Sequence, residues 1–210
     1  MNKIQAKQIS SFNQQVLSIF IDDQAICDYL SATTNNPAFK NLWCAWLLDD
    51  ARKAWEQDGS YIWNLIENKQ ACNLPILLCA DDMDFYCDIV VAQVRYEADV
   101  VIWEKIGFVT GAFDKEQWKR SGIQNIEKWS EKDWEWYGET LAHLDVDDKA
   151  WEEWWSANWL EEENRRLWNY YHPYFNDDSN IQWLEVESVS FLAKEYDACV
   201  AAFKQNKILM

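Results

Sequence analysis

The stretch from Pro75 to Thr110 constrains the fold most, because it is the one long part of the chain whose pattern is typical of a β-sheet. It contains three strand candidates, separated by turns that contain aspartate: Pro75–Ala80, Phe85–Glu97 and Asp99–Thr110. Apolar, β-branched runs that end at such turns predict strands. The connection between Tyr96 and Asp99 is too short for a crossover helix, so it predicts an antiparallel hairpin. We therefore expect a three-stranded meander over about residues 75–110.

The rest of the chain carries mostly helical patterns, in which apolar residues recur every three or four positions. These patterns predict helices over Gln8–Phe20, over a short segment capped by Asp22-Asp23 and ending near Leu30, from Asn36-Pro37 to Asp58-Gly59-Ser60, over Tyr61–Asn68, over Lys149–Tyr171 with an end at His172-Pro173, and over Val189–Phe203. One further strand is expected at Ile181–Val186. The chain is thus predicted to be a single α+β domain over residues 1–210, with a small, mainly antiparallel sheet packed with several helices.

No run of about 18 apolar residues is present, so we expect no transmembrane helix. The first residues lead into an amphipathic pattern and not into the apolar core of a signal peptide. Both observations predict a cytoplasmic protein.

The net charge of −17 argues against nucleic acid or an anionic membrane surface as a direct ligand, because both would repel the chain. It favours a basic protein partner or mimicry of nucleic acid. Solubility alone is the alternative explanation, since acidic surfaces are common.

The segment Glu131–Glu163 concentrates this charge. Its twelve acidic residues and two lysines give a net charge of −10, and it holds six of the fifteen tryptophans. Tryptophan anchors protein interfaces, and carboxylates pair with the cations of a partner. Alternatively, the tryptophans are core residues and the acids form a solvated helix face. We predict a partner-binding surface made by Asp145, Asp147, Asp148, Glu152, Glu153, Trp154, Glu161, Glu162 and Glu163.

Metal-binding patterns are weak. The six cysteines are irregularly spaced, without a C-x-x-C, and are expected to be reduced and mostly buried. A zinc site from Cys72, Cys79, Cys87 and one histidine lacks ligand spacing. The run Asp81-Asp82-Met83-Asp84 offers three carboxylates that could hold Mg²⁺, although such a run is also typical of a solvated turn. We therefore expect no bound metal and no other cofactor.

Catalytic signatures are equally weak. The sequence contains no G-x-S-x-G, no phosphate-binding glycine loop and no H-E-x-x-H. His143 and His172 stand without a nucleophile at suggestive spacing. We expect a protein that is not an enzyme.

The chain resembles the immunity proteins of bacterial polymorphic-toxin systems, including contact-dependent growth inhibition. The likeness rests on Cys79-Ala-Asp-Asp82, on Val101-Ile-Trp-Glu-Lys-Ile-Gly107 and on the acidic, tryptophan-rich segment Trp129–Trp168. The resemblance implies a small cytoplasmic protein that binds one cognate toxin, often through a basic C-terminal nuclease domain, and blocks its active site. It implies no catalytic residues.

Three hypotheses follow. The first is an inhibitor that neutralises a basic toxin domain through its acidic, tryptophan-rich surface. The alternatives are a metal-dependent enzyme that uses Asp81, Asp82 and Asp84, and a structural or adaptor subunit of a larger assembly.

Overall fold

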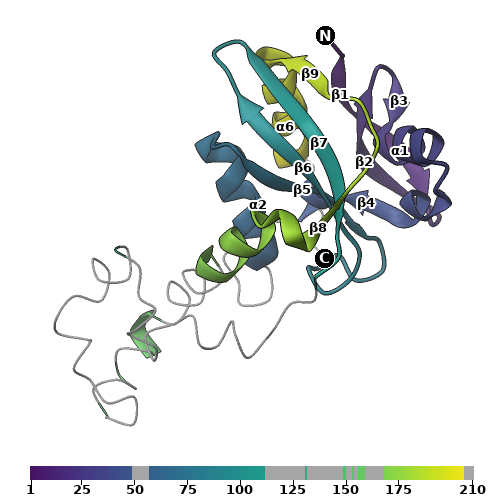
Figure 1. Cartoon of the computed structure of the whole chain (residues 1–210). Coiled ribbons are helices and arrows are strands. Elements are labelled where there is room, and N and C mark those ends of the chain that lie inside the picture. The colour runs from purple at the N-terminus through teal and green to yellow at the C-terminus, as the bar shows by residue number, and fades with distance from the viewer. Residues whose placement is uncertain are drawn as a thin grey trace.

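The computed structural model describes residues 1–48, 57–111 and 168–205, together with residues 131, 149, 153 and 156–158. The described residues form an α+β fold in which all strand pairs are antiparallel (Figure 1). The strands are β1 (Ile4–Ser11), β2 (Gln14–Ile21), β3 (Gln24–Ala25), β4 (Leu42–Cys44), β5 (Cys72–Cys79), β6 (Ile89–Tyr96), β7 (Val100–Val109), β8 (Ile181–Trp183) and β9 (Val189–Leu192). The helices are α1 (Ile26–Thr34), α2 (Gln57–Asn68) and α6 (Ala193–Gln205), with 3₁₀ turns η1 (Pro37–Asn41), η2 (Ala45–Leu47) and η4 (Asp178–Asn180) and a helical stretch at 168–175.

The predicted meander is confirmed as the centre of the larger sheet, whose order is β4-β5-β6-β7-β8, with β9 also paired to β7. The expected strand near residue 181 is confirmed as β8, although it is shorter than predicted. It lies close to β7, since a Cβ on Gly107 would come within 2.6 Å of Ile181 Cγ2. The second strand begins at Ile89 and not at Phe85, so residues 85–88 belong to the preceding loop.

The predicted helix over Gln8–Phe20 is wrong, because this stretch forms most of the β1–β2 hairpin. Phe12 and Asn13 both have positive φ, as the tight turn of a hairpin requires. Ile9 and Val16, which helical spacing had placed on one face, are cross-strand partners instead. A pair seven residues apart satisfies both arrangements, and the turn residues decide between them.

Two predicted helix caps have different outcomes. Helix α1 is confirmed, but its N-cap is Ala25, and Asp22-Asp23 instead make the turn between β2 and β3. The predicted start at Asn36-Pro37 is confirmed, since the Asn36 side chain accepts from the backbone N–H of Ala38. The element there is only the short turn η1, which is followed by β4, so the expected long helix is wrong.

Three further boundaries differ from expectation. Asp58-Gly59-Ser60 was predicted to end a helix and instead lies in the first turn of α2. The helical stretch 168–175 continues past His172-Pro173. The helix predicted over Val189–Phe203 is strand β9 followed by α6, because Val189 and Phe191 pair with β7.

The core contains two aromatic centres. Trp46 is fully buried and contacts the rings of Trp103, Tyr196 and Phe203 at centroid distances of 6.3, 5.7 and 5.6 Å. These contacts join η2, β7 and α6. The second centre surrounds Tyr61 of α2 and is formed by Phe85, Trp168, Tyr171 and Phe175. Figure 1 shows the corresponding arrangement, with α6 behind β7 and residues 168–175 beside α2.

Candidate functional site

The predicted partner-binding surface lies almost entirely outside the described residues. Of its nine members, the structure describes Glu153, which is exposed and forms an ion pair with Lys149 at 3.3 Å. The other eight are not among the described residues: Asp145, Asp147, Asp148, Glu152, Trp154, Glu161, Glu162 and Glu163. The assignment of this surface therefore stays a prediction.

A second acidic region is described fully, namely the connection Ala80–Asp88, which we call the β5–β6 loop. Its ends are held together, because Cys79 N–H donates to the carbonyl of Asp88 at 3.0 Å and Met83 N–H donates to the carbonyl of Cys79 at 2.9 Å. Met83 and Phe85 point into the core and are only 5% and 1% exposed. Because these two side chains point inward, the side chains of the residues next to them point outward.

The carboxylate of Asp58 anchors the loop to the body of the protein. Asp58 of α2 accepts a hydrogen bond from Phe85 N–H at 3.0 Å and another from the Tyr171 hydroxyl at 2.8 Å. It thus joins α2, the β5–β6 loop and the stretch 168–175. Burial raises the pKa of Asp58 to about 6, against the opposing effect of these two hydrogen bonds, and the charge of Asp84 raises it further.

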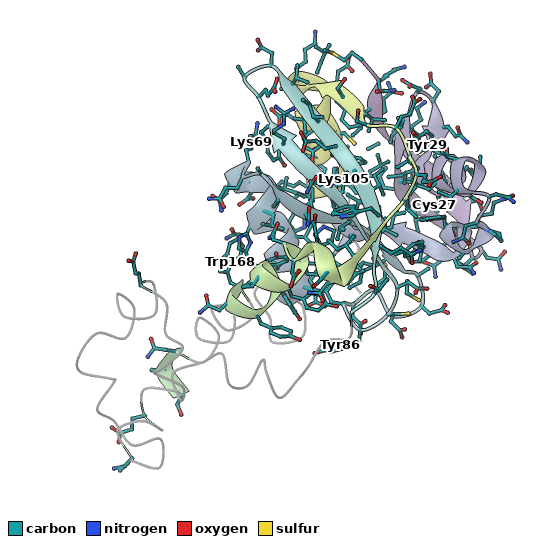
Figure 2. The ribbon with its side chains drawn as sticks, in the orientation of Figure 1. Cys27, Tyr29, Lys69, Tyr86, Lys105 and Trp168 are labelled. Carbon is teal, nitrogen blue, oxygen red and sulfur yellow. The ribbon has the colours of Figure 1, made fainter. Side chains whose placement is uncertain are left out.

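The outer face of the loop is strongly anionic. Asp81, Asp82 and Asp88 are exposed and Asp84 is half-buried. Within the described part of the chain, no ion pair joins any of these four carboxylates to a lysine or arginine. Tyr86 belongs to the same loop and has 58% of its surface exposed, and Figure 2 shows it at the lower edge of the body. The loop therefore presents an exposed aromatic ring together with carboxylates that have no ion-pair partner in the described part of the chain.

The three-aspartate metal site, which the sequence offered only as an alternative to a solvated turn, does not assemble. Asp84 Oδ1 accepts from Tyr86 N–H at 2.9 Å, which is the local turn bond that aspartate commonly makes. In the described residues, the one set of three ligand groups close enough to share an ion is Cys79, Asp82 and Cys87, whose ligand atoms lie within 4.8 Å of one another. Asp82 thus joins two thiols and not Asp81 and Asp84.

The cysteines are all free, and four of them are buried: Cys27, Cys44, Cys72 and Cys199. Cys79 is half-buried and Cys87 is exposed. A hydrogen bond with Cys79 is the main cause that raises the pKa of Cys87 to about 11, so this thiol is protonated at neutral pH. A thiolate is the reactive form of cysteine, so the raised pKa of Cys87 is opposite in direction to the shift that activates a catalytic thiol.

The sequence did not indicate the residues that anchor the loop, because they are distant from it in the chain. Asp58 and Tyr171 are 113 positions apart, and Asp58 was assigned to a helix end. Tyr86 falls within the predicted strand Phe85–Glu97, near its start, whereas it lies in the loop. The available signal was the Asp-rich run between two strand patterns, which correctly indicated a connection but not its anchors.

Comparison of the chain with protein-family models, with curated proteins and with solved structures finds no match. Among the described helices, none combines the length and the apolar character that crossing a lipid bilayer requires.

Proposed function

We propose that this protein is an inhibitor that binds and neutralises one basic protein partner, as the immunity proteins of bacterial toxin systems do. The observation that carries the proposal is the β5–β6 loop, which holds the exposed ring of Tyr86 and four carboxylates without an ion-pair partner in the described structure. An aromatic anchor within a charged rim is the usual composition of a strong protein interface.

The distribution of charge supports this proposal. Six of the described cations already form ion pairs within the chain: Lys3, Lys7, Lys69, Arg95, Lys149 and Lys204. Because these six cations are engaged elsewhere, none of them balances the negative charge of the loop, and a basic partner could do so. A basic protein would meet an attractive field there and would associate faster at low salt.

The anchoring of the loop supports it as well. Binding costs free energy when side chains and loops must be ordered on contact. Here Met83 and Phe85 are buried and Asp58 holds the backbone of Phe85, so the loop is ordered before a partner arrives. The mechanism that fits is occlusion, in which loop carboxylates and those of residues 145–163 occupy the cations by which a nuclease holds phosphate.

The test is capture of proteins from a lysate of the source cell at low salt, with the full-length protein as bait and identification by mass. The first variant bait carries Asp81→Lys and Asp88→Lys in the loop. The matched control carries Glu185→Lys and Glu187→Lys, which make the same change in net charge between β8 and β9, where both side chains are exposed. A third bait reverses the charges of Glu152, Glu153, Glu161 and Glu162.

We expect one basic protein to be captured by the wild-type and control baits and lost from the loop variant, and we expect its purified activity to be blocked by the wild-type chain. Loss from the third bait would add the predicted 145–163 surface to the interface. Equal loss from the loop variant and the control would mean that only net charge matters, and the proposed contact would be wrong. A stable assembly of several proteins would instead favour a structural subunit.

A further inference from the structure

We propose that Cys79, Asp82 and Cys87 form a binding site for a single Zn²⁺ ion on the β5–β6 loop. This inference goes beyond the proposed inhibitor function and does not depend on it, because it concerns the isolated chain. It rests on the convergence of two thiols and one carboxylate whose ligand atoms all lie within 4.8 Å of one another.

The spacing suits a small metal ion. Zinc binds sulfur at about 2.3 Å and carboxylate oxygen at about 2.0–2.2 Å, so two sulfurs on one tetrahedral ion lie about 3.8 Å apart. The side chains of Asp82 and Cys87 are exposed, so no core packing opposes their adjustment to such an ion. The bonds from Cys79 N–H to Asp88 and from Met83 N–H to Cys79 close the loop and hold its ends together.

The donor set selects the kind of metal. Mg²⁺ and Ca²⁺ prefer oxygen ligands, whereas two cysteine sulfurs, which release their protons to solvent as the metal binds, favour zinc and other softer ions. The neighbouring carboxylates of Asp81, Asp84 and Asp88 add negative potential that attracts a cation to the loop. Three ligands from the chain leave a fourth position for water or for a group of another molecule.

The carboxylate distinguishes this proposal from a disulfide between the same two cysteines. A disulfide needs only Cys79 and Cys87, and the position of Asp82 would have no influence on it. A metal site needs all three groups. The side chains of Asp82 and Asp81 therefore provide a matched pair, because they are adjacent, exposed and of equal charge, and only Asp82 belongs to the converging set.

The experiment titrates the reduced full-length protein with Co²⁺, whose thiolate-to-metal charge-transfer absorption reports sulfur ligation, and then displaces the Co²⁺ with Zn²⁺. We expect one Co²⁺ per chain with this absorption and its complete loss on addition of Zn²⁺. Cys87→Ser should abolish the absorption. Asp82→Asn should keep a weakened absorption and lower the affinity at least about tenfold, the smallest effect usual for disturbing a metal site. Asp81→Asn should keep the full absorption and lower the affinity far less than Asp82→Asn does, because it removes a nearby charge and no ligand.

Three outcomes would overturn the proposal. The first is stoichiometric Co²⁺ binding without thiolate absorption, which would indicate oxygen ligation elsewhere. The second is an equal loss of affinity in Asp81→Asn and Asp82→Asn, which would indicate a diffuse acidic surface and not a site. The third is a chain that takes up no Co²⁺ although free-thiol assay shows both cysteines reduced. Circular dichroism of each variant checks that the fold is retained.

Discussion

The turn between β2 and β3 and the β5–β6 loop are both rich in aspartate, yet they differ in what their carboxylates contact. In the β2–β3 turn, Asp22 accepts from Lys3 N–H at 2.8 Å and from the Asn2 side chain at 2.7 Å. Asp23 forms ion pairs with Lys7 at 2.5 Å and Lys3 at 3.7 Å. These contacts lower the pKa of both carboxyl groups, chiefly through the backbone bond from Lys3 to Asp22 and the Lys7 bond to Asp23.

In the β2–β3 turn, the same aspartates carry the charge and hold the backbone in place. In the β5–β6 loop, different residues do these two things. Its position is fixed by a different carboxylate, Asp58, and by the buried side chains of Met83 and Phe85. Its own exposed aspartates are left without a cation in the described structure. We therefore expect a partner to contact the loop rather than the turn, because contacts within the chain already engage the carboxylates of the turn.

The largest expected effect concerns the anchor of the loop. Asp58→Ala removes the acceptor of two buried donors, Phe85 N–H and the Tyr171 hydroxyl. Each donor left without a partner costs about 1–3 kcal/mol, so we expect the free energy of unfolding to fall by about 2 kcal/mol or more. Urea unfolding at about pH 4 measures this change, before ionisation of Asp58 lowers the stability of the wild type. Asp58→Asn retains one acceptor and should lose less, and an Asp58→Ala protein as stable as the wild type would show that the loop is anchored otherwise.

The pH dependence of stability should have opposite signs in the two regions. The pKa of Asp58 is raised to about 6 from an ordinary value of 3.8, so its contribution to stability is fully present below about pH 3.8 and is lost as the pH rises through about 6. The groups that face it are Asp84, Tyr86 and Tyr171. Asp22 has a lowered pKa, so its contribution is present above about 3.8 and is lost as the pH falls.

The measurement compares urea unfolding of the wild type and Asp58→Asn at several pH values. Asparagine does not titrate, so the other carboxylates cancel in the difference between the two proteins. A difference of about two pKa units corresponds to about 3 kcal/mol, and we expect the wild type to lose most of this amount relative to the variant between about pH 4 and pH 7. Parallel stability curves would mean that Asp58 titrates normally.

Two exposed aromatic residues, one in the loop and one elsewhere, allow a test of whether the loop contacts the partner. Tyr86 on the loop and Phe12 at the β1–β2 turn are 58% and 55% exposed. If the loop contacts the partner, Tyr86→Ala should weaken binding by about 2 kcal/mol, or about 30-fold in Kd, as is usual for an aromatic anchor. Phe12→Ala should leave Kd unchanged. Calorimetry with the captured partner measures both, and equal effects would place the interface elsewhere.

The parts of the fold that follow from local pattern were predictable from the sequence. The β5–β6–β7 meander consists of β-branched runs bounded by turn residues, and the sheet confirms it. The N-terminal hairpin was not predictable from spacing alone, because Ile9 and Val16 fit both a helical face and a cross-strand pair. The positive φ of Asn13 in the turn decided the outcome, and a tight turn between polar residues carries little periodic signal.

The candidate site was predictable in composition but not in arrangement. The sequence shows the aspartates at positions 81, 82 and 84. It does not show that Asp82 lies near two thiols, or that Asp84 accepts a hydrogen bond from the backbone N–H of Tyr86. Which carboxylates are neutralised depends on contacts between distant positions, such as Asp23 with Lys7. Tertiary structure determines these contacts, so they cannot be predicted from a local sequence pattern.

The smallest expected effect compares single alanine substitutions in the two acidic connections. Asp22→Ala removes both hydrogen bonds of the carboxylate and places alanine at a φ of 49°, so we expect a loss of about 1 kcal/mol in the free energy of unfolding. The side chain of Asp81 is exposed and makes no hydrogen bond or ion pair within the described structure. Asp81→Ala should therefore stay within about 0.5 kcal/mol of the wild type.

Thermal and urea unfolding at neutral pH measure the stabilities of Asp22→Ala and Asp81→Ala relative to the wild type. The loss in Asp22→Ala should shrink as the medium becomes acidic, because the wild-type carboxylate is then protonated and its hydrogen bonds weaken. Equal stability of the two variants would show that the β2–β3 turn does not depend on its carboxylate. In that case the aspartates of the turn would be as available to a partner as those of the loop, and the distinction between the two regions would fail.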